Sequence, residues 1–200
     1  MKSLVILLLS VFAIASRPEG GYDVGDTVSD FKLKNVDGKM VSLADFKTAK
    51  GFIVIFDCIT CPVSKAYNSR IIALNKKFAT EGFPVVLINP NSGEVVAEES
   101  FDEMVKHAKN HKYDFPFLYD ESQETVKKFY PTNTPHVFIL NKVSNQMKVV
   151  YIGGIDNNSR DGSKADKHYV EDAVNDLLTG RSVATPKTRT VGCSIKWKNS

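Results

Sequence analysis

The stretch GFIVIFD, residues 51–57, constrains the fold more than any other part of the sequence. Its continuous apolar run is typical of a strand that is buried on both faces of a sheet. Behind it, apolar residues recur at helical spacing from Val63 to Phe78, and PVVLIN, residues 84–89, is predicted to be a second buried strand. A strand, a helix and a strand in this order imply a parallel pair with a right-handed crossover.

Shorter elements are predicted on both sides of this unit. FKLK (31–34) and MVSL (40–43) alternate apolar and polar residues around the turn Asp37-Gly38, which predicts a hairpin. HVFIL (136–140) and KVVYIG (148–153) have a short connection, so we expect them to pair antiparallel. A short edge strand is expected at 115–120, and further helices at 100–111, 122–130 and 165–178. The sequence therefore predicts an α/β fold, with a central mixed β-sheet, helices on both faces and an N-terminal β-hairpin.

The N-terminus has the layout of a signal peptide. It has a basic Lys2, an apolar run from Leu4 to Ile14 and small residues up to Ala15, after which we predict cleavage. The run is shorter than the roughly 20 residues that a membrane-spanning helix needs. A buried N-terminal strand or an uncleaved anchor is the alternative. We therefore expect residues 1–15 to be a signal peptide and the protein to be exported, periplasmic or secreted, with no integral membrane span after cleavage.

The remaining chain is expected to form one domain over residues 24–180, followed by a tail, 181–200, that is either packed on the domain or flexible. With 200 residues, of which 42% are hydrophobic, the chain can bury one substantial core. The 26 Lys and Arg are scattered among 23 Asp and Glu, giving a net charge of +3. This pattern has no basic patch of the kind that binds nucleic acid, so no nucleic-acid partner is expected.

Cys58 and Cys61 follow the first predicted strand and precede the helix. The carboxyl ends of parallel strands are where ligands and chemistry gather in such sheets. Free backbone N–H groups and the helix dipole favour a thiolate at a helix start, so we expect the pKa of Cys58 to lie below its ordinary value. A thiolate attacks disulfides, and Cys61, one turn on, can attack the mixed disulfide that results. The spacing predicts a redox dithiol.

Other readings of the pair are weaker. A structural zinc site needs four ligands, and the chain has no second Cys-x-x-Cys, while His107 and His111 are expected to lie on a solvated helix face. Two inert, buried thiols are a further reading. A copper-binding module that uses Cys58, Cys61 and His136 remains an alternative, because thiolates and imidazole suit copper. No metal and no cofactor is expected.

Cys193 is the third and odd cysteine, in VGCSIKW near the C-terminus. An odd cysteine in an exported chain indicates a free thiol, an intermolecular bridge or a third redox member. We expect Trp197 to dock the tail on the body and favour a structural or unreactive role for Cys193.

Thr134-Pro135 immediately precedes a predicted apolar strand. Proline is awkward inside a central strand, so it should mark the start of that strand, and the sequence leaves open whether the bond is cis or trans. Together, the thiol pair and the Thr-Pro resemble the thioredoxin superfamily. More closely, the chain resembles bacterial peroxiredoxin-like thioredoxin-family proteins related to the alkyl hydroperoxide reductase/thiol-specific antioxidant group. The matching stretches include VGDTVSDFKLKNVDGKMVSLADF, GFIVIFDCITCPVSKAYNSRIIALNKKF, VVLINPN, TPHVFIL, VVYIGGIDN and VGCSIKWK.

The resemblance implies a thioredoxin-like fold and a thiol–disulfide oxidoreductase active in redox homeostasis. Cys58 would attack, Cys61 would resolve, Pro135 would be the cis-proline beside them, and the backbone of Thr134 would dock the extended chain of a partner. The implied partners are protein dithiols or disulfides and an upstream electron donor or acceptor.

Three positions depart from the patterns of related families. Asp57 stands where thioredoxins usually carry Trp, Ile55 stands where peroxiredoxins carry Thr, and His136 stands near the position of a peroxiredoxin Arg. A thiol peroxidase is therefore the alternative to the oxidoreductase. Asp57 is expected to accept a proton from Cys61, to raise the pKa of Cys58, or to be only a polar strand end. His136 either contacts the thiols or is a satisfied surface histidine.

Overall fold

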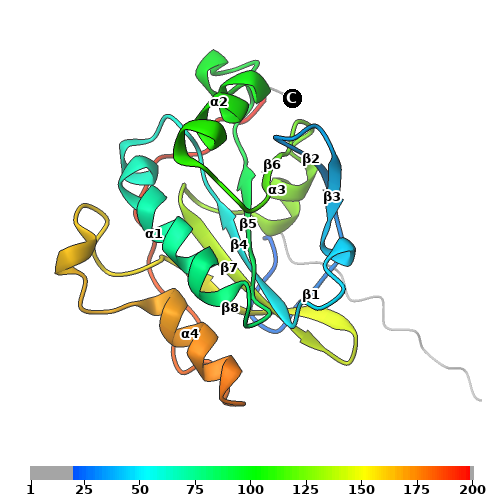
Figure 1. The fold of residues 1–200 in the computed structure, drawn as a ribbon, viewed down its shortest axis with the longest axis vertical. Coiled ribbons are helices and arrows are strands. Elements are labelled where there is room, and N and C mark those ends of the chain that lie inside the picture. The colour runs from blue at the N-terminus through cyan, green and yellow to red at the C-terminus, as the bar shows by residue number, and fades with distance from the viewer. Residues whose placement is uncertain (1–19, 199–200) are drawn as a thin grey trace, which may run out of the picture.

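A computed structural model describes residues 20–198, and the predicted signal peptide lies outside this range. Its strands form one mixed sheet in the order β1-β8-β7-β4-β5-β6-β2-β3 (Figure 1). The strands are β1 (Thr27–Val28), β2 (Lys32–Asn35), β3 (Met40–Ser42), β4 (Gly51–Phe56), β5 (Val85–Asn89), β6 (Phe117–Tyr119), β7 (His136–Val143) and β8 (Gln146–Gly153). The helices are α1 (Pro62–Phe78), α2 (Phe101–His111), α3 (Glu124–Phe129) and α4 (Tyr169–Leu178). This is the α/β fold that the sequence predicts.

β4 lies at the centre of the sheet and confirms the reading of the apolar run. It pairs in parallel with β5 and antiparallel with β7, and every residue in it is buried. Ile53 and Ile55 pack into the core that α1, α2 and α4 cover, whereas Phe52, Val54 and Phe56 pack into the core on the side of α3. Because both faces of β4 are covered, its side chains are apolar throughout and do not alternate between apolar and polar residues.

The N-terminal hairpin is confirmed, but the predicted edge strand is not at an edge. β2 and β3 pair antiparallel, and β2 also pairs with β6 through Lys34 and Asn35. The hairpin thus continues the sheet beyond β6. Two smaller differences arise at element ends: α4 begins at Tyr169, after a 3-10 turn at Gly162–Lys164, and the two-residue β1 is too short to leave a pattern.

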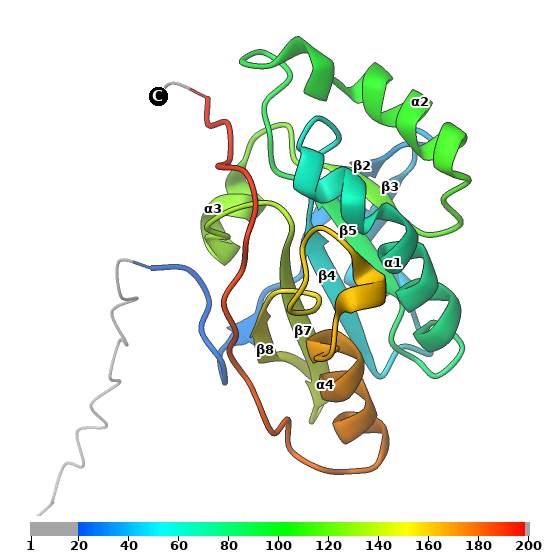
Figure 2. The same cartoon turned by 90° about the vertical axis from the view of Figure 1, so that its left-hand side faces the viewer.

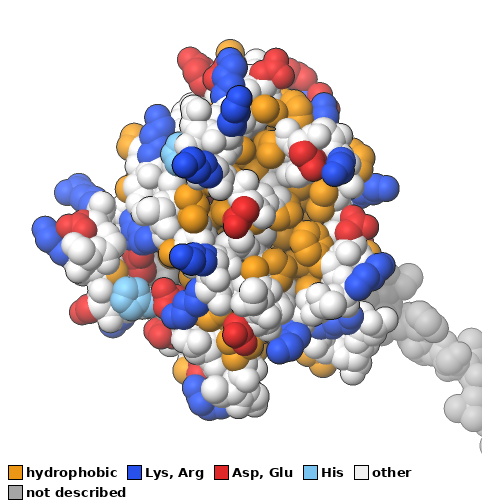
Figure 3. Space-filling view, in the orientation of Figure 1, with side chains coloured by type: hydrophobic (Ala, Val, Ile, Leu, Met, Phe, Trp, Pro, Cys, Tyr) orange, Lys and Arg blue, Asp and Glu red, His pale blue; other side chains and the backbone are white. Residues whose placement is uncertain are grey.

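The surface carries both signs of charge close together. On the face in Figure 3, Lys and Arg side chains are spread among Asp and Glu side chains around a central area where hydrophobic side chains gather. Within residues 20–198, none of the helices combines the length and the apolar character needed to cross a membrane.

Residues 181–198 form an extended tail that packs along the domain. Figure 2 shows it running from the end of α4, past β8 and β7, to the region of α3. Backbone hydrogen bonds attach it to β8 through Ile152, which donates to Pro186 and accepts from Thr188. Farther along, Cys193 pairs with Thr134 in an antiparallel bridge, and Ser92 donates to the carbonyl of Lys196. The tail therefore reaches the carboxyl end of β4.

Candidate active site

All three cysteines meet at the carboxyl end of β4. Cys58 lies two residues beyond the strand, and Cys61 is the N-cap of α1, with Pro62 as the first helical residue. Cys61 forms a disulfide with Cys193, which is 132 residues away in sequence, with a Cα–Cα distance of 6.0 Å. Cys58 is free and buried. The bond in the structure is therefore different from the Cys58–Cys61 pair that the resemblance implies.

Thr134 contacts each of the three cysteines. Its peptide bond to Pro135 is cis, and its hydroxyl lies 3.0 Å from Cys58 Sγ. Its carbonyl oxygen is 3.8 Å from Cys61 Sγ. Its N–H donates to the carbonyl of Cys193 at 2.9 Å, and its own carbonyl accepts from the N–H of Cys193 at 3.1 Å. The structure thus brings Thr134 and Pro135 beside the thiols, together with a cysteine that the sequence reading had placed outside the reaction.

The pKa of Cys58 is raised, and the expected lowering is wrong. Burial of the thiol is the main cause, and the charge on Asp57 adds to it. The hydrogen bond with the Thr134 hydroxyl acts in the opposite direction. The effect of the helix dipole is strongest within the first turn of a helix. Because α1 begins at Pro62, Cys58 lies outside that turn, and the dipole does little to lower its pKa.

Asp57 is a buried carboxyl next to Cys58. Burial raises its pKa to about 7, against the lowering effect of hydrogen bonds from the Ser64 side chain and the Cys58 backbone. Its Oδ1 has no hydrogen-bond partner among residues 20–198. With a pKa near neutrality, this carboxyl can take up or release a proton during thiol chemistry.

Glu99 is a site residue that the sequence reading missed. It is fully buried, and its carboxylate accepts the backbone N–H of Ile59 at 3.2 Å and of Thr60 at 2.9 Å. The Thr60 hydroxyl and the Asn89 side chain also donate to it. Ile59 and Thr60 are the two residues between the cysteines, so Glu99 fixes the loop that carries them. In the sequence AEES, residues 97–100, Glu99 stands directly after Glu98, and no pattern there indicates that one of the two glutamates is buried.

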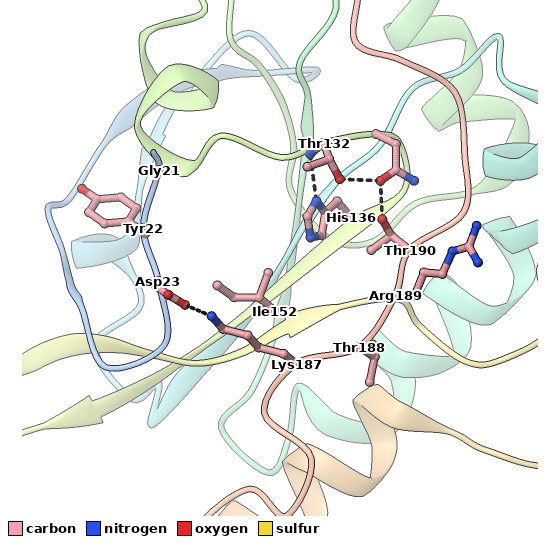
Figure 4. A pocket seen from close by; sticks show the side chains of 11 residues that line it. Gly21, Tyr22, Asp23, Thr132, His136, Ile152, Lys187, Thr188, Arg189 and Thr190 are labelled. Carbon is pink, nitrogen blue, oxygen red and sulfur yellow. Dashed lines mark hydrogen bonds and ion pairs between the residues drawn. The ribbon is translucent and has the colours of Figure 1, made fainter. Parts of the chain in front are cut away.

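His136 lies at the start of β7 in register with Phe56, on the α3 side of the sheet. Its Nδ1 accepts the backbone N–H of Thr132 at 3.0 Å, and burial lowers its pKa to about 4. His136 lines an open hollow of about 690 Å³, and Figure 4 shows its ring near Thr190. His136 therefore has a hydrogen-bond partner, as the second interpretation expected, but it is buried and not on the surface. Its partner is a backbone N–H and not a thiol.

Among residues 20–198, no set of side chains placed to ligate a metal forms around these thiols. The part of the chain that the structure describes contains no group of three or more His, Cys, Asp or Glu placed to hold a metal ion. His107 and His111 stack on each other and hydrogen-bond to Tyr113 and Asn68, so they are part of a packed cluster rather than a solvated face.

Comparisons with known proteins agree with this architecture. The model of the AhpC/TSA family matches residues 24–152. No curated protein matches the chain. An uncharacterized conserved protein from Geobacillus kaustophilus has 34% identity and a TM-score of 0.82, with 89% of this chain and 94% of that chain covered. A hypothetical protein from Sinorhizobium meliloti has 28% identity and a TM-score of 0.82, over 90% and 98% of the two chains.

A solved structure with a functional description is more distant. It is a thiol:disulfide interchange protein of the thioredoxin family from Chlorobium tepidum, with 22% identity and a TM-score of 0.53, over 66% of this chain and 87% of that chain. A likeness at this level shows the fold alone. The fold is thioredoxin-like, as the resemblance implied.

Proposed function

The chain belongs to the AhpC/TSA family, and from that premise we propose that it is an exported thiol–disulfide oxidoreductase. The family and fold are those of thiol-based oxidoreductases and peroxidases. In the proposed reaction the Cys58 thiolate attacks a disulfide sulfur of a partner protein, and the partner's second sulfur leaves as a thiolate that takes up a proton. The Cys61 thiolate then attacks Cys58, so that a Cys58–Cys61 disulfide forms and the partner leaves reduced. Cys61 becomes available for this step when a dithiol of an upstream electron donor reduces Cys61–Cys193 and is itself oxidised to a disulfide.

One observation carries this proposal. The backbone N–H and C=O of Thr134, beside Cys58 and Cys61, pair with an extended segment that contains a cysteine. Extended peptides commonly bind by adding main-chain hydrogen bonds to such an edge. In the structure the paired segment is the chain's own tail, and a partner strand would use the same two groups after the tail has left.

Asp57 is proposed to exchange protons with the thiols. It is buried next to Cys58, one of its oxygens lacks a partner within the described residues, and its pKa lies near 7. An unpaired acceptor with such a pKa can receive the proton that a thiol gives up when it becomes a nucleophile. Since the Cys58 pKa is raised, the reaction should accelerate as the pH increases above neutrality.

The test is reduction of a disulfide-bonded model peptide, with dithiothreitol as the final reductant. Cys58→Ser should lower the rate about a hundredfold or more, to the rate of dithiothreitol alone. In a single turnover of prereduced protein from which dithiothreitol has been removed, Cys61→Ser should accumulate a mixed disulfide between Cys58 and the peptide, because the resolving thiol is missing. A Cys58→Ser protein that keeps the wild-type rate would show that the proposal is wrong.

A thiol peroxidase is the second candidate, and the family itself is the observation that favours it. The surroundings of Cys58 argue against a peroxidase. The negative charges of Asp57 and Glu99 raise the pKa of Cys58 and so disfavour the reactive thiolate. We expect peroxide to react with Cys58 no faster than with an ordinary thiol. Peroxide consumption that far exceeds this rate, and that disappears in Cys58→Ser, would favour the peroxidase.

Export is proposed from the N-terminal pattern alone. If residues 1–15 are removed on export, the mature protein begins at Ser16. Intact-mass measurement of the protein recovered from outside the cytoplasm tests this directly. A mature mass that includes Met1 would argue against cleavage.

A further inference from the structure

The tail is held at the active site mainly through its backbone. Besides the reciprocal bonds between Cys193 and Thr134, the N–H of Lys196 donates to Asn91 Oδ1 at 2.8 Å. The N–H of Lys198 donates to Gln123 Oε1 at 2.8 Å, and Gln123 also donates to the carbonyl of Lys196. Loops from three parts of the domain therefore bind the backbone of this segment as they would bind an extended peptide.

The sequence of the tail is fitted to this position at Gly192. A Cβ atom at this residue would overlap the carbonyl oxygen of Thr134, so only glycine allows the backbone to approach so closely. Ile195, three residues on, is buried in the core on the α3 side of the sheet. These two features place the sulfur of the intervening Cys193 against Cys61.

Cys58 lies next to this bond with a free thiol. It is three residues from Cys61 and shares Thr134 as a neighbour with both members of the disulfide. A free thiol beside a disulfide is the arrangement in which thiol–disulfide exchange takes place within one molecule.

We propose that Cys193 is a third redox residue, and that the disulfide moves between Cys61–Cys193 and Cys58–Cys61. Resting on the proposed function, this assigns the tail as a built-in substrate of the same thiols. The Cys58 thiolate attacks Cys61 Sγ, a Cys58–Cys61 bond forms, the Cys61–Cys193 bond breaks, and Cys193 leaves as a thiolate that takes up the proton given up by Cys58. No net oxidation occurs. In the tethered form, Cys61 is bonded to Cys193, so the tail is covalently attached and Cys58 is the free thiol. In the released form, Cys58 is bonded to Cys61, so the tail has no covalent attachment and Cys193 is the free thiol.

The two forms should have different consequences for partners. While Cys61 is bonded to Cys193, the backbone groups of Thr134 are covered by the tail. After exchange the tail keeps only its noncovalent contacts, so that a partner strand can compete for Thr134. Exchange thus couples the position of the disulfide to access at the docking edge.

The test begins with the wild-type protein oxidised by glutathione disulfide until one thiol per chain remains. Acid quenching, N-ethylmaleimide labelling and peptide mass spectrometry then show which cysteine was free. We expect the label on both Cys58 and Cys193 and none on Cys61. Label on Cys58 alone, or on Cys193 alone, would overturn the proposal because the bond would then occupy a single position.

Variants calibrate the two forms. Cys58→Ser should hold the bond at Cys61–Cys193, and Cys193→Ser should hold it at Cys58–Cys61. The chain has one tryptophan, Trp197, which packs beside the α3-side core, so its emission should be red-shifted in oxidised Cys193→Ser relative to oxidised Cys58→Ser. Equal emission in the two variants, with Trp197 still packed, would mean that the tail is not released and would count against the coupling.

A substitution that leaves all three cysteines in place gives the sharpest comparison. Gly192→Val should disfavour the tethered form and raise the Cys193-to-Cys58 label ratio about tenfold or more. Gly20→Val is the control, because a Cβ at Gly20 meets nothing within 4 Å, and it should leave the ratio unchanged. An unchanged ratio in Gly192→Val would contradict the proposed close fit.

These outcomes are separable from those of the proposed function. If the label is found only on Cys193 while peptide reduction still depends on Cys58, the disulfide relay is wrong and the oxidoreductase stands. If peptide reduction does not depend on Cys58, the proposed function fails wherever the label is found.

Discussion

Two segments supply the three sulfur atoms, and the fold holds them in different ways. The loop of residues 57–61 connects β4 to α1, and its N–H groups donate to the buried carboxylate of Glu99. The tail, residues 181–198, has mostly exposed or partly exposed side chains and is attached by backbone hydrogen bonds and the bond to Cys61. Loss of the loop's contacts would disturb the core, whereas loss of the tail's contacts need not. Each prediction below tests one side of this difference.

The largest expected effect is on the loop. Glu99→Ala leaves four donors without their acceptor inside the protein and should lower the free energy of unfolding by about 5 kcal/mol. Urea denaturation measures this loss. Glu98→Ala, at the exposed neighbouring position, is the control and should stay within about 0.5 kcal/mol of wild type. If Glu99→Ala does not fold, Glu99→Gln, which keeps one acceptor oxygen, should show a smaller loss.

The next effect concerns the buried carboxyl at the start of the loop. The pKa of Asp57 is about 7 in the folded protein against an ordinary value of 3.8, so the folded state holds its proton more tightly than the unfolded state. The contribution of Asp57 to the free energy of unfolding is therefore greatest below about pH 4, decreases as the pH rises to about 7, and stays constant above that.

Asp57→Asn should remove this decline, which amounts to at most about 4 kcal/mol. Denaturation at pH 4 and pH 8 of both proteins measures it, and the variant should gain stability relative to wild type only at the higher pH. An equal difference at both pH values would contradict a carboxyl that titrates in this range.

The tail should respond more locally. Cys193→Ser removes a bond between residues 132 apart and should lower the free energy of unfolding by about 3 kcal/mol under oxidising conditions. In a hydrogen-exchange measurement, the amides of Thr134 and of the residue at position 193 should exchange faster than in wild type, while the amide of Ile53 in β4 keeps its protection. Fully reduced wild type is the control and should resemble the variant. Lost protection in β4 would mean that the tail is part of the core after all.

The smallest effect is expected where the two segments meet. The Thr134 hydroxyl bonds to Cys58 Sγ and holds the thiol pKa lower than burial alone would leave it. Thr134→Val should therefore move the pH midpoint of Cys58 alkylation upward, and Thr134→Ser, which keeps the hydroxyl, should leave it near that of wild type. Alkylation by iodoacetamide across a pH series, in protein that carries the Cys61–Cys193 disulfide, measures both.

The sequence predicted the scaffold of the site because its signals are local. A continuous apolar run followed by helical periodicity identifies β4 and α1, and the two cysteines are placed by the junction between them. The cis Thr134-Pro135 bond beside them came from the resemblance, with the sequence itself leaving cis and trans open.

What could not be predicted depends on contacts between distant parts of the chain. Cys193 lies in a segment without periodicity, and its partner is set by backbone bonds to Thr134. Glu99 looks like its exposed neighbour, and only the folding of the segment between β5 and α2 buries it beside Thr60. The direction of the Cys58 pKa followed from the same cause, because burial outweighs a helix start that lies four residues away.

The bond between Cys61 and Cys193 closes most of the domain into a covalent ring, residues 61–193, with an N-terminal arm. The arm carries β4, which lies in the sheet between β7 and β5, two strands of the ring. After a single proteolytic cut in the partly exposed segment between β8 and α4, the two pieces would therefore stay joined for as long as Cys61 is bonded to Cys193. Reduction, or exchange to Cys58–Cys61, would separate them, because Cys58 and Cys61 lie on the same piece. A denaturing gel of thiol-blocked protein would then show one band or two according to where the disulfide is.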